Sequence, residues 1–258
     1  MNDVLCSIEN GIARISINRP EQRNALNPAV LRGLRAALES ICSNRTVGVI
    51  TVTGEGDKVF CAGADLKAAL AERPEGEAFD RSEYRDLLTD LLKCPKPTVA
   101  LARGHVLAGG LGILLACDLS LACDDVFFST PEIQVGMFPM MVLALLYRHV
   151  GRKRATEMLF LGERVPAAAA LEYGIVNHIF PRAQFDVCAS EYLQRIAAKS
   201  RQILKLGKEA IARIEDWSLA QELEYLEDAL SGVMSTEDSR EGIRAFLEKR
   251  KAARKIDE

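Results

Sequence analysis

Three short stretches of the 258-residue sequence hold residues whose types and spacing suit catalysis. In CAGAD (61–65), Gly63 relieves the steric limits on a turn and leaves the backbone N–H of Ala64 free to point at a ligand. In GHVLAGGLG (104–112), Gly109 lies where a strand should give way to a helix, and the first N–H groups of a helix are unpaired and favour negative charge. Two such donors converging on one oxygen would form an oxyanion hole, which stabilises an enolate formed from a thioester. Either stretch alone is also consistent with a tight turn in a compact α/β fold.

The third stretch, FSTPEIQVGMFPMM (128–141), contains a single acidic residue, Glu132, among apolar neighbours. Apolar surroundings raise the pKa of a carboxyl group, so Glu132 would be able to take up and release protons near neutral pH. The alternative is a surface glutamate at the edge of a strand.

Turn residues and apolar periodicity predict the elements that must position these stretches. The pair Asn10-Gly11 favours the positive φ of a hairpin between two strands, and Asn27 followed by Pro28 predicts the start of a helix. Further strands are predicted over 47–54, 97–104 and 119–125, and a further helix over about 83–93. Residues 71–82 are charged and contain proline and glycine, which indicates a mobile surface excursion. The alternation of strands and helices predicts a layered α/β core over residues 1–198.

Residues 199–258 have a different, helical pattern. Ser218 and Gln221 have the spacing of a capping box, and leucines follow on one helical stripe (Leu219, Leu223, Leu226 and Leu230). The last segment, REGIRAFLEKRKAARK (240–255), is predicted to be an amphipathic helix with a basic end. We therefore expect a C-terminal helical region after the core.

Composition excludes several classes of protein. The chain is 48% hydrophobic and 27% charged with a formal net charge of −3, which gives no electrostatic case for binding nucleic acid or an anionic membrane. Seven cysteines form no CxxC pair and no zinc-like spacing, so neither a disulfide framework nor a metal site is predicted. No signal peptide and no apolar run of membrane-spanning length is recognisable, and we expect a cytoplasmic protein.

Six motifs, taken together and in order, resemble the crotonase (enoyl-CoA hydratase/isomerase) superfamily. They extend over essentially the whole chain: INRPEQRNALN, FCAGADLK, GHVLAGGLGILLACD, TPEIQVGMFP, GRKRATEMLFLGERVPAAAALEYGIVNHI and AFLEKRK. The resemblance implies a ββα spiral core, a C-terminal helical region that takes part in trimerisation, and an assembly that is a homotrimer or a dimer of trimers. It also implies an acyl-CoA thioester as substrate, with coenzyme A as part of that substrate rather than as a cofactor.

The resemblance assigns roles to individual residues. Ala64 and Gly109 would supply the two oxyanion N–H groups, and Glu132 matches the second of the two catalytic glutamates of hydratases. Residues of the first two motifs would line the coenzyme A site: Arg23, Ala25, Cys61, Ala62, Gly63 and Lys67. Phe246 and Lys249 match positions that contact the nucleotide end of coenzyme A, commonly from a neighbouring subunit.

The sequence departs from this pattern at Gly112. In hydratases with two glutamates, the first follows the oxyanion glycine by three residues, and here that position is a glycine. The acid used by dienoyl-CoA isomerases would fall at Met140, which argues against that activity. One carboxylate suffices for a 1,3 proton shift, in which Glu132 removes a proton from C2 or C4 and returns it at the other end.

Several reactions stay open at this point. Single-glutamate hydratases exist in the superfamily, so hydration remains an alternative to isomerisation. Thioester hydrolysis and decarboxylation are other reactions of the same fold. From a different class, the chain could be a catalytically degenerate subunit that binds acyl-CoA within an assembly. Acyl chain length is not determined by the sequence.

Overall fold

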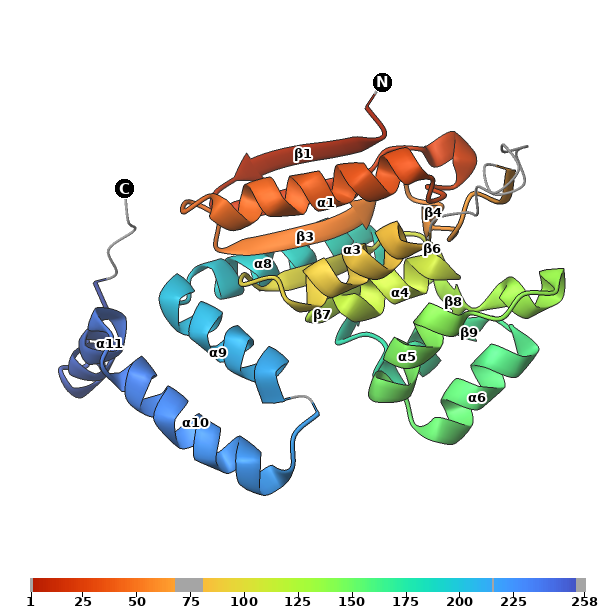
Figure 1. Ribbon diagram of the computed structural model, residues 1–258. Coiled ribbons are helices and arrows are strands. Elements are labelled where there is room, and N and C mark those ends of the chain that lie inside the picture. The colour runs from red at the N-terminus through yellow and green to blue at the C-terminus, as the bar shows by residue number, and fades with distance from the viewer. Residues whose placement is uncertain (1, 68–80, 215, 254–258) are drawn as a thin grey trace.

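The structure, a computed structural model, describes residues 2–67, 81–214 and 216–253 (Figure 1). Its first strands, β1 (Val4–Glu9) and β2 (Ile12–Ile17), form an antiparallel hairpin. Asn10 and Gly11 join them with φ values of 51° and 76°. Because Asn-Gly adopts positive φ readily, the predicted hairpin is confirmed.

The first helix, α1 (Pro28–Ser43), also begins where the sequence predicts. The side-chain oxygen of Asn27 accepts a hydrogen bond from the N–H of Val30 at 2.7 Å, which satisfies one of the unpaired amides of the first turn. Leucines spaced along α1 are buried against the sheet, so the helix is held by its apolar face as well as by its cap.

The main sheet has six strands in the order β1-β2-β3-β5-β7-β10, and neighbours are parallel from β2 onward. The strands after the hairpin are β3 (Val49–Gly54), β5 (Thr98–Ala102), β7 (Leu119–Cys123) and β10 (His178–Phe180). Every residue of β3 and β5 is buried. Strands with helices on both faces are expected to be apolar throughout, which explains why these segments lack a polar alternation.

Two layers of helices cover this sheet (Figure 1). Ile15 and Val52 line a void shared with α1, α3 (Ser82–Leu92) and α4 (Gly109–Ala116). Arg14 and Thr51, their neighbours along the strands, line a hollow shared with α8 (Phe185–Ala197). Because successive side chains of a strand point to opposite faces, α8 packs on the face opposite to α1 and α3.

A second, smaller sheet stands beside the first, with the strand order β4-β6-β8-β9. Its strands are β4 (Val59–Cys61), β6 (His105–Leu107), β8 (Phe127–Ser129) and β9 (Val165–Pro166). The first three are parallel, and β9 is antiparallel to β8. These strands could not be predicted from the sequence, because segments of two or three residues are too short to show a periodic pattern.

The remaining helices complete the core. They are α5 (Met140–His149), α6 (Arg152–Leu161) and α7 (Ala167–Glu172), with short 3-10 helices η1 (Pro20–Gln22), η2 (Pro131–Val135) and η3 (Arg182–Gln184). The predicted excursion over 71–82 lies outside the described residues except for 81 and 82, where α3 begins.

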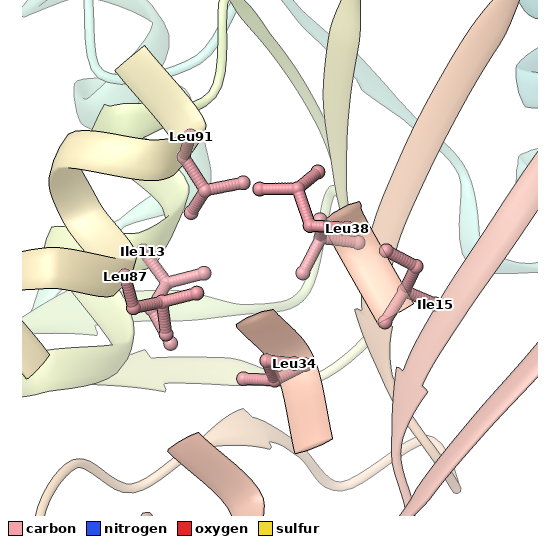
Figure 2. Close-up of a pocket in the computed structure, with 7 residues that line it drawn as sticks. Ile15, Leu34, Leu38, Leu87, Leu91 and Ile113 are labelled. Carbon is pink, nitrogen blue, oxygen red and sulfur yellow. The ribbon is translucent and has the colours of Figure 1, made fainter. Parts of the chain in front are cut away.

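A void of about 10 Å³ lies inside the core between α1, α3, α4 and the main sheet (Figure 2). Its lining is entirely apolar: Ile15, Leu34, Leu38, Val52, Leu87, Leu91 and Ile113. A space of this size with no polar partner stays dry. The void is therefore a packing defect of the core and not a binding site.

Three helices form the C-terminal region: α9 (Arg201–Ile214), α10 (Leu219–Met234) and α11 (Glu237–Leu247). At the start of α10, the side-chain oxygen of Gln221 accepts the N–H of Ser218 at 3.2 Å, as the predicted capping box requires. The Nζ of Lys208 on α9 donates to the carboxylate of Asp118 at 2.5 Å and to a core carbonyl, that of Lys96, at 2.9 Å. The division of the chain into domains at residue 198 stays a prediction.

The last helix is shorter than the sequence predicts. α11 ends at Leu247, and Lys249 adopts a left-handed φ of 53°. The chain then turns back, because the guanidinium of Arg250 pairs with the carboxylate of Glu241 at 2.6 Å and the N–H of Arg250 donates to the carbonyl of Ala245 at 3.0 Å. The predicted helix over 240–255 is therefore wrong beyond Leu247, and residues 254 and 255 lie outside the described part.

Candidate active site

The three parallel strands of the small sheet each lead into one predicted catalytic residue. Ala64 lies three residues after β4, Gly109 two residues after β6, and Glu132 three residues after β8. Parallel strands end at the same edge of a sheet, which is where α/β folds bind their ligands. The small sheet therefore gathers at one edge three residues that are up to 68 positions apart in the sequence.

The loop after β4 contacts the start of α4 at Gly63. This glycine has a φ of 82°, and a Cβ placed on it would lie 2.5 Å from the Cβ of Ala108 and 2.9 Å from the N atom of Gly109. Both the backbone conformation and the space therefore require glycine. This close approach places the backbone that carries the Ala64 amide directly against the backbone that carries the Gly109 amide.

The hydrogen bonds that hold the two loops are made by neighbouring backbone groups and do not use the amides of the two predicted oxyanion donors. The N–H of Leu26 donates to the carbonyl of Gly63 at 2.8 Å, and the N–H of Ala108 donates to that of Ser129 at 2.9 Å. The amides of Ala64 and Gly109 donate in none of the hydrogen bonds formed among the described residues. Two adjacent unpaired amides, one of them at a helix N-terminus, suit a partially negative oxygen.

Backbone strain is concentrated next to one of these donors. Ala108 has φ 51° and ψ −129°, a conformation that residues with a Cβ rarely adopt. The hydrogen bond from its N–H to Ser129 on β8 and the packing of Gly63 on its Cβ hold it there. Such strain typically persists where the surrounding structure fixes a functional geometry.

Glu132 lies in η2 and is half-buried. Its Oε2 atom is buried and has no hydrogen-bond partner among the described residues. Burial raises the pKa of this carboxyl, and the hydrogen bond from its own backbone amide opposes that shift. A buried carboxylate oxygen without a partner is uncommon in native proteins, and a perturbed pKa in such a place is typical of functional sites.

A tyrosine occupies the space around Gly112. A Cβ placed on Gly112 would lie 2.1 Å from the hydroxyl oxygen of Tyr84 on α3. The same hydroxyl donates to the carbonyl of Gly109 at 2.6 Å. Burial raises the pKa of Tyr84 well above its ordinary value, and the nearby carboxylate of Glu132 adds to this, so the phenol stays protonated.

Tyr84 could not be recognised as a site residue from the sequence. Its spacing to Leu87, Leu88 and Leu91 is that of the apolar face of a helix, and all four side chains are buried. Nothing in this pattern separates a tyrosine that contacts a site from one that fills the core, so only the packing of α3 on α4 identifies it.

The residues predicted to line the coenzyme A site lie together along two facing segments. The N–H of Ala62 donates to the carbonyl of Arg23 at 3.1 Å, and Ala25 is buried beside the bridge between Leu26 and Ala64. The side chains of Arg23 and Lys67 are exposed, as cations that contact phosphate groups would be.

Cys61 contributes to this region through its backbone and its volume. Its thiol is fully buried, and burial raises the pKa of the Cys61 thiol to about 12, so it carries no charge. The sulfur accepts the N–H of Gly63 at 3.4 Å. The buried side chain of Cys61 therefore stabilises the loop that follows β4.

Phe246 and Lys249 are not brought to the other predicted site residues within one chain. They lie in and just after α11, at the opposite end of the molecule from β4, β6 and β8 (Figure 1). The side chain of Phe246 is 82% exposed. A role at the coenzyme A site would require the chain to associate with another copy.

The described part of the chain holds neither a metal-site cluster nor a membrane-spanning helix. No group of three or more His, Cys, Asp or Glu side chains there is placed to hold a metal ion. No helix there is long and apolar enough to cross a membrane.

A mixed α/β core with a small parallel sheet beside the main one, followed by helices at the C-terminus, is a crotonase fold. Residues 7–255 match the family described as enoyl-CoA hydratase/isomerase. The putative enoyl-CoA hydratase/isomerase YngF of Bacillus subtilis is 33% identical over 258 residues, with 98% of each chain covered. Enoyl-CoA hydratase domain-containing protein 3 of Rattus norvegicus, named as mitochondrial, is 31% identical, covering 94% of this chain and 81% of its own.

Solved structures agree with this assignment. The crystal structure of an enoyl-CoA hydratase from Bacillus anthracis has a TM-score of 0.92 and 32% identity, and covers 99% of this chain and 100% of its own. That of human enoyl coenzyme A hydratase domain-containing protein 3 has a TM-score of 0.92 and 29% identity, and covers 98% and 100%. The chain therefore belongs to the enoyl-CoA hydratase/isomerase family.

Proposed function

We propose that this protein isomerises enoyl-CoA thioesters, with Glu132 as the only acid/base. One observation carries the proposal: the buried Oε2 of Glu132 has no partner in the described part of the chain, while Gly112 offers no second carboxylate. A single carboxylate can remove a proton and return it elsewhere, whereas the two-glutamate addition of water needs a second acid.

The reaction would proceed through a dienolate. The Glu132 carboxylate takes a proton from C2 of a 3-enoyl thioester, and the electrons of that C–H bond move toward the thioester carbonyl, whose oxygen becomes negative. The amides of Ala64 and Gly109 donate to this oxygen, which stabilises it because the donors are already oriented. The protonated Glu132 then delivers the proton to C4, the double bond forms between C2 and C3, and the thioester carbonyl is restored.

The raised pKa of Glu132 suits both halves of this cycle. A carboxylate in ordinary solution is too weak a base to remove a C2 proton readily. Burial destabilises the charged form, which makes the carboxylate more basic and keeps the carboxylic acid able to protonate C4.

Coenzyme A would be held by the two facing segments around residues 23–25 and 61–67. The exposed cations of Arg23 and Lys67 are the residues expected to contact its phosphates. Phe246 and Lys249 would reach the nucleotide end from a neighbouring subunit. No cofactor beyond the coenzyme A of the substrate is needed for the proton shift.

The C-terminal helices support an assembled state, a homotrimer or a dimer of trimers. Their large apolar side chains are exposed in the single chain: Leu219 69%, Leu223 59%, Leu230 57%, Met234 55%, Ile243 50% and Leu247 74%. Exposed apolar surface of this extent is typical of a subunit interface. Sedimentation equilibrium should give a mass of three or six chains, and a stable monomer at micromolar concentration would refute this. The predicted cytoplasmic location stays a prediction.

The experiment compares the wild type with Glu132→Gln on 3-enoyl-CoA and 2-enoyl-CoA substrates, following the ultraviolet absorbance of the conjugated thioester. Glu172→Gln, on the exposed surface of α7, is the matched control. We expect Glu132→Gln to lower isomerisation by about 10²- to 10⁴-fold, the usual contribution of a general acid/base, and the control to leave it unchanged.

Each of the other possible outcomes would identify a different function. Hydration of 2-enoyl-CoA that exceeds isomerisation would make the protein a single-glutamate hydratase, the activity that the names of several relatives favour. Release of free coenzyme A from these substrates would indicate thioester hydrolysis, and release of carbon dioxide from an acyl-CoA that carries a carboxylate at C2 would indicate decarboxylation. Binding of acyl-CoA without turnover would identify a degenerate assembly subunit. Isomerisation that survives Glu132→Gln would refute the single-glutamate mechanism.

A further inference from the structure

Tyr84 and the position of residue 112 compete for the same space. A Cβ on Gly112 would lie 2.1 Å from the hydroxyl oxygen of Tyr84 and 3.3 Å from its Cζ. Real Cβ atoms essentially never approach another heavy atom closer than 3.0 Å. A side chain at 112 and the present placement of Tyr84 are therefore mutually exclusive.

Tyr84 is held in this place from both ends. Its ring is buried in the core beside Leu87, Leu88 and Leu91 of α3. Its hydroxyl donates a short hydrogen bond of 2.6 Å to the carbonyl of Gly109. The phenol consequently cannot swing aside without breaking this bond.

The hydroxyl of Tyr84 also lies beside the oxyanion donor. A Cβ placed on Gly109 would be 3.4 Å from both the Cζ and the hydroxyl oxygen of Tyr84. The phenol thus contacts two glycines of α4 that are one turn apart, Gly109 and Gly112. By bonding the Gly109 carbonyl, it fixes the orientation of the residue whose N–H points into the site.

We infer that Tyr84 is a positioning residue that takes the place of the first hydratase glutamate and sets the reaction specificity of the site. It fixes the Gly109 backbone, and it fills with a neutral hydroxyl the space in which a second carboxylate would activate water. One part of this inference rests on the proposed function, namely that the site prefers a proton shift to hydration. The steric exclusion of a side chain at 112 does not depend on that function.

The first arm of the test is a stability cycle on the whole protein with Gly112→Ala, Tyr84→Ala and the double variant. In the wild-type background, Gly112→Ala should lower the melting temperature by about 2 to 10 °C, because overpacking costs more than the gain in helix propensity. In the Tyr84→Ala background, the same substitution should leave it unchanged or raise it, because alanine is the better helix former. Equal effects in both backgrounds would overturn the exclusion.

The second arm measures kinetics and products. Tyr84→Phe keeps the ring and removes the hydroxyl; we expect kcat for isomerisation to fall at least tenfold with KM unchanged, since the loss is in oxyanion orientation. Tyr147→Phe, which removes a hydroxyl from a more exposed ring on α5, is the matched control. A KM increase at unchanged kcat would overturn the positioning role.

The double variant Tyr84→Ala/Gly112→Glu tests specificity. Restoring a carboxylate where the phenol stood should raise the ratio of hydrated to isomerised product at least tenfold over the wild type, provided that the melting curve shows a folded protein. An unchanged ratio in the folded double variant would overturn the specificity role. If the wild type turned over no enoyl-CoA, the proposed function would fail, and the stability cycle would still decide whether Tyr84 excludes a side chain at 112.

Discussion

Replacing Glu132 by glutamine should stabilise this protein at neutral pH while removing its proposed activity. The buried Oε2 has no partner among the described residues, and an unsatisfied buried polar group costs about 1 to 3 kcal/mol when neutral and more when charged, so exchanging the carboxylate for a neutral amide removes part of the cost. Because the residue is only half-buried, water screens part of this cost, and we take the lower end, about 1 kcal/mol. For a chain of this size, that corresponds to a rise in melting temperature of about 2 to 4 °C.

The sign of the pH dependence follows from the raised pKa of Glu132. Below the ordinary pKa of glutamate, about 4.3, the carboxyl is protonated in both folded and unfolded chains, so burying it costs little. As the pH rises through the higher pKa of the folded state, the unfolded chain ionises more readily and the folded state loses stability. The advantage of Glu132→Gln should therefore appear at pH 7 and vanish near pH 4.

Thermal unfolding followed by circular dichroism at both pH values, with Glu172→Gln as control, measures this difference. The same samples assayed on 3-enoyl-CoA should show activity lost in Glu132→Gln only. A variant that is destabilised at pH 7, or equally stabilised at both pH values, would refute the reasoning that Glu132 is a buried carboxylate kept for chemistry.

Two further substitutions test the structure around the site. Gly63→Ala should destabilise the protein by about 2 to 4 kcal/mol and abolish turnover, because it adds a Cβ at positive φ against the Cβ of Ala108; Gly207→Ala, in open space on α9, should be neutral or stabilising in the same melting experiment. Lys208→Met should cost about 1 to 2 kcal/mol in urea unfolding, because it removes the charge-assisted hydrogen bond to the partly exposed carboxylate of Asp118; an unchanged unfolding midpoint would show that this bond does not stabilise the packing of α9.

Some of the elements that build the site can be predicted from the sequence pattern and others cannot. Helix caps, the Asn10-Gly11 turn and the long buried strands have strong local signals, and the structure confirms them. The strands β4, β6 and β8 span three residues each, and no periodicity can emerge over that length. Those short strands nevertheless align the three segments that carry Ala64, Gly109 and Glu132.

The end of the chain shows the same limit. An amphipathic pattern continues past Leu247, so the sequence predicts a longer helix. The helix ends because Arg250 folds back to pair with Glu241, a contact nine residues apart that requires the left-handed turn at Lys249. Helix propensity is a weak preference, and a paired guanidinium with a reversed backbone outweighs it here.

The sequence by itself determined the family, the α/β class, the absence of a second hydratase glutamate at Gly112, and a short set of candidate site residues. These depend on residue identity and order, which need no coordinates. Only the tertiary structure decided that the Ala64 and Gly109 backbones meet, that an oxygen of Glu132 is buried without a partner in the described residues, and that Tyr84 fills the space beside Gly112. The physical reason is that burial and steric exclusion arise between elements distant in sequence, here α3 packed on α4, and local patterns do not encode such contacts.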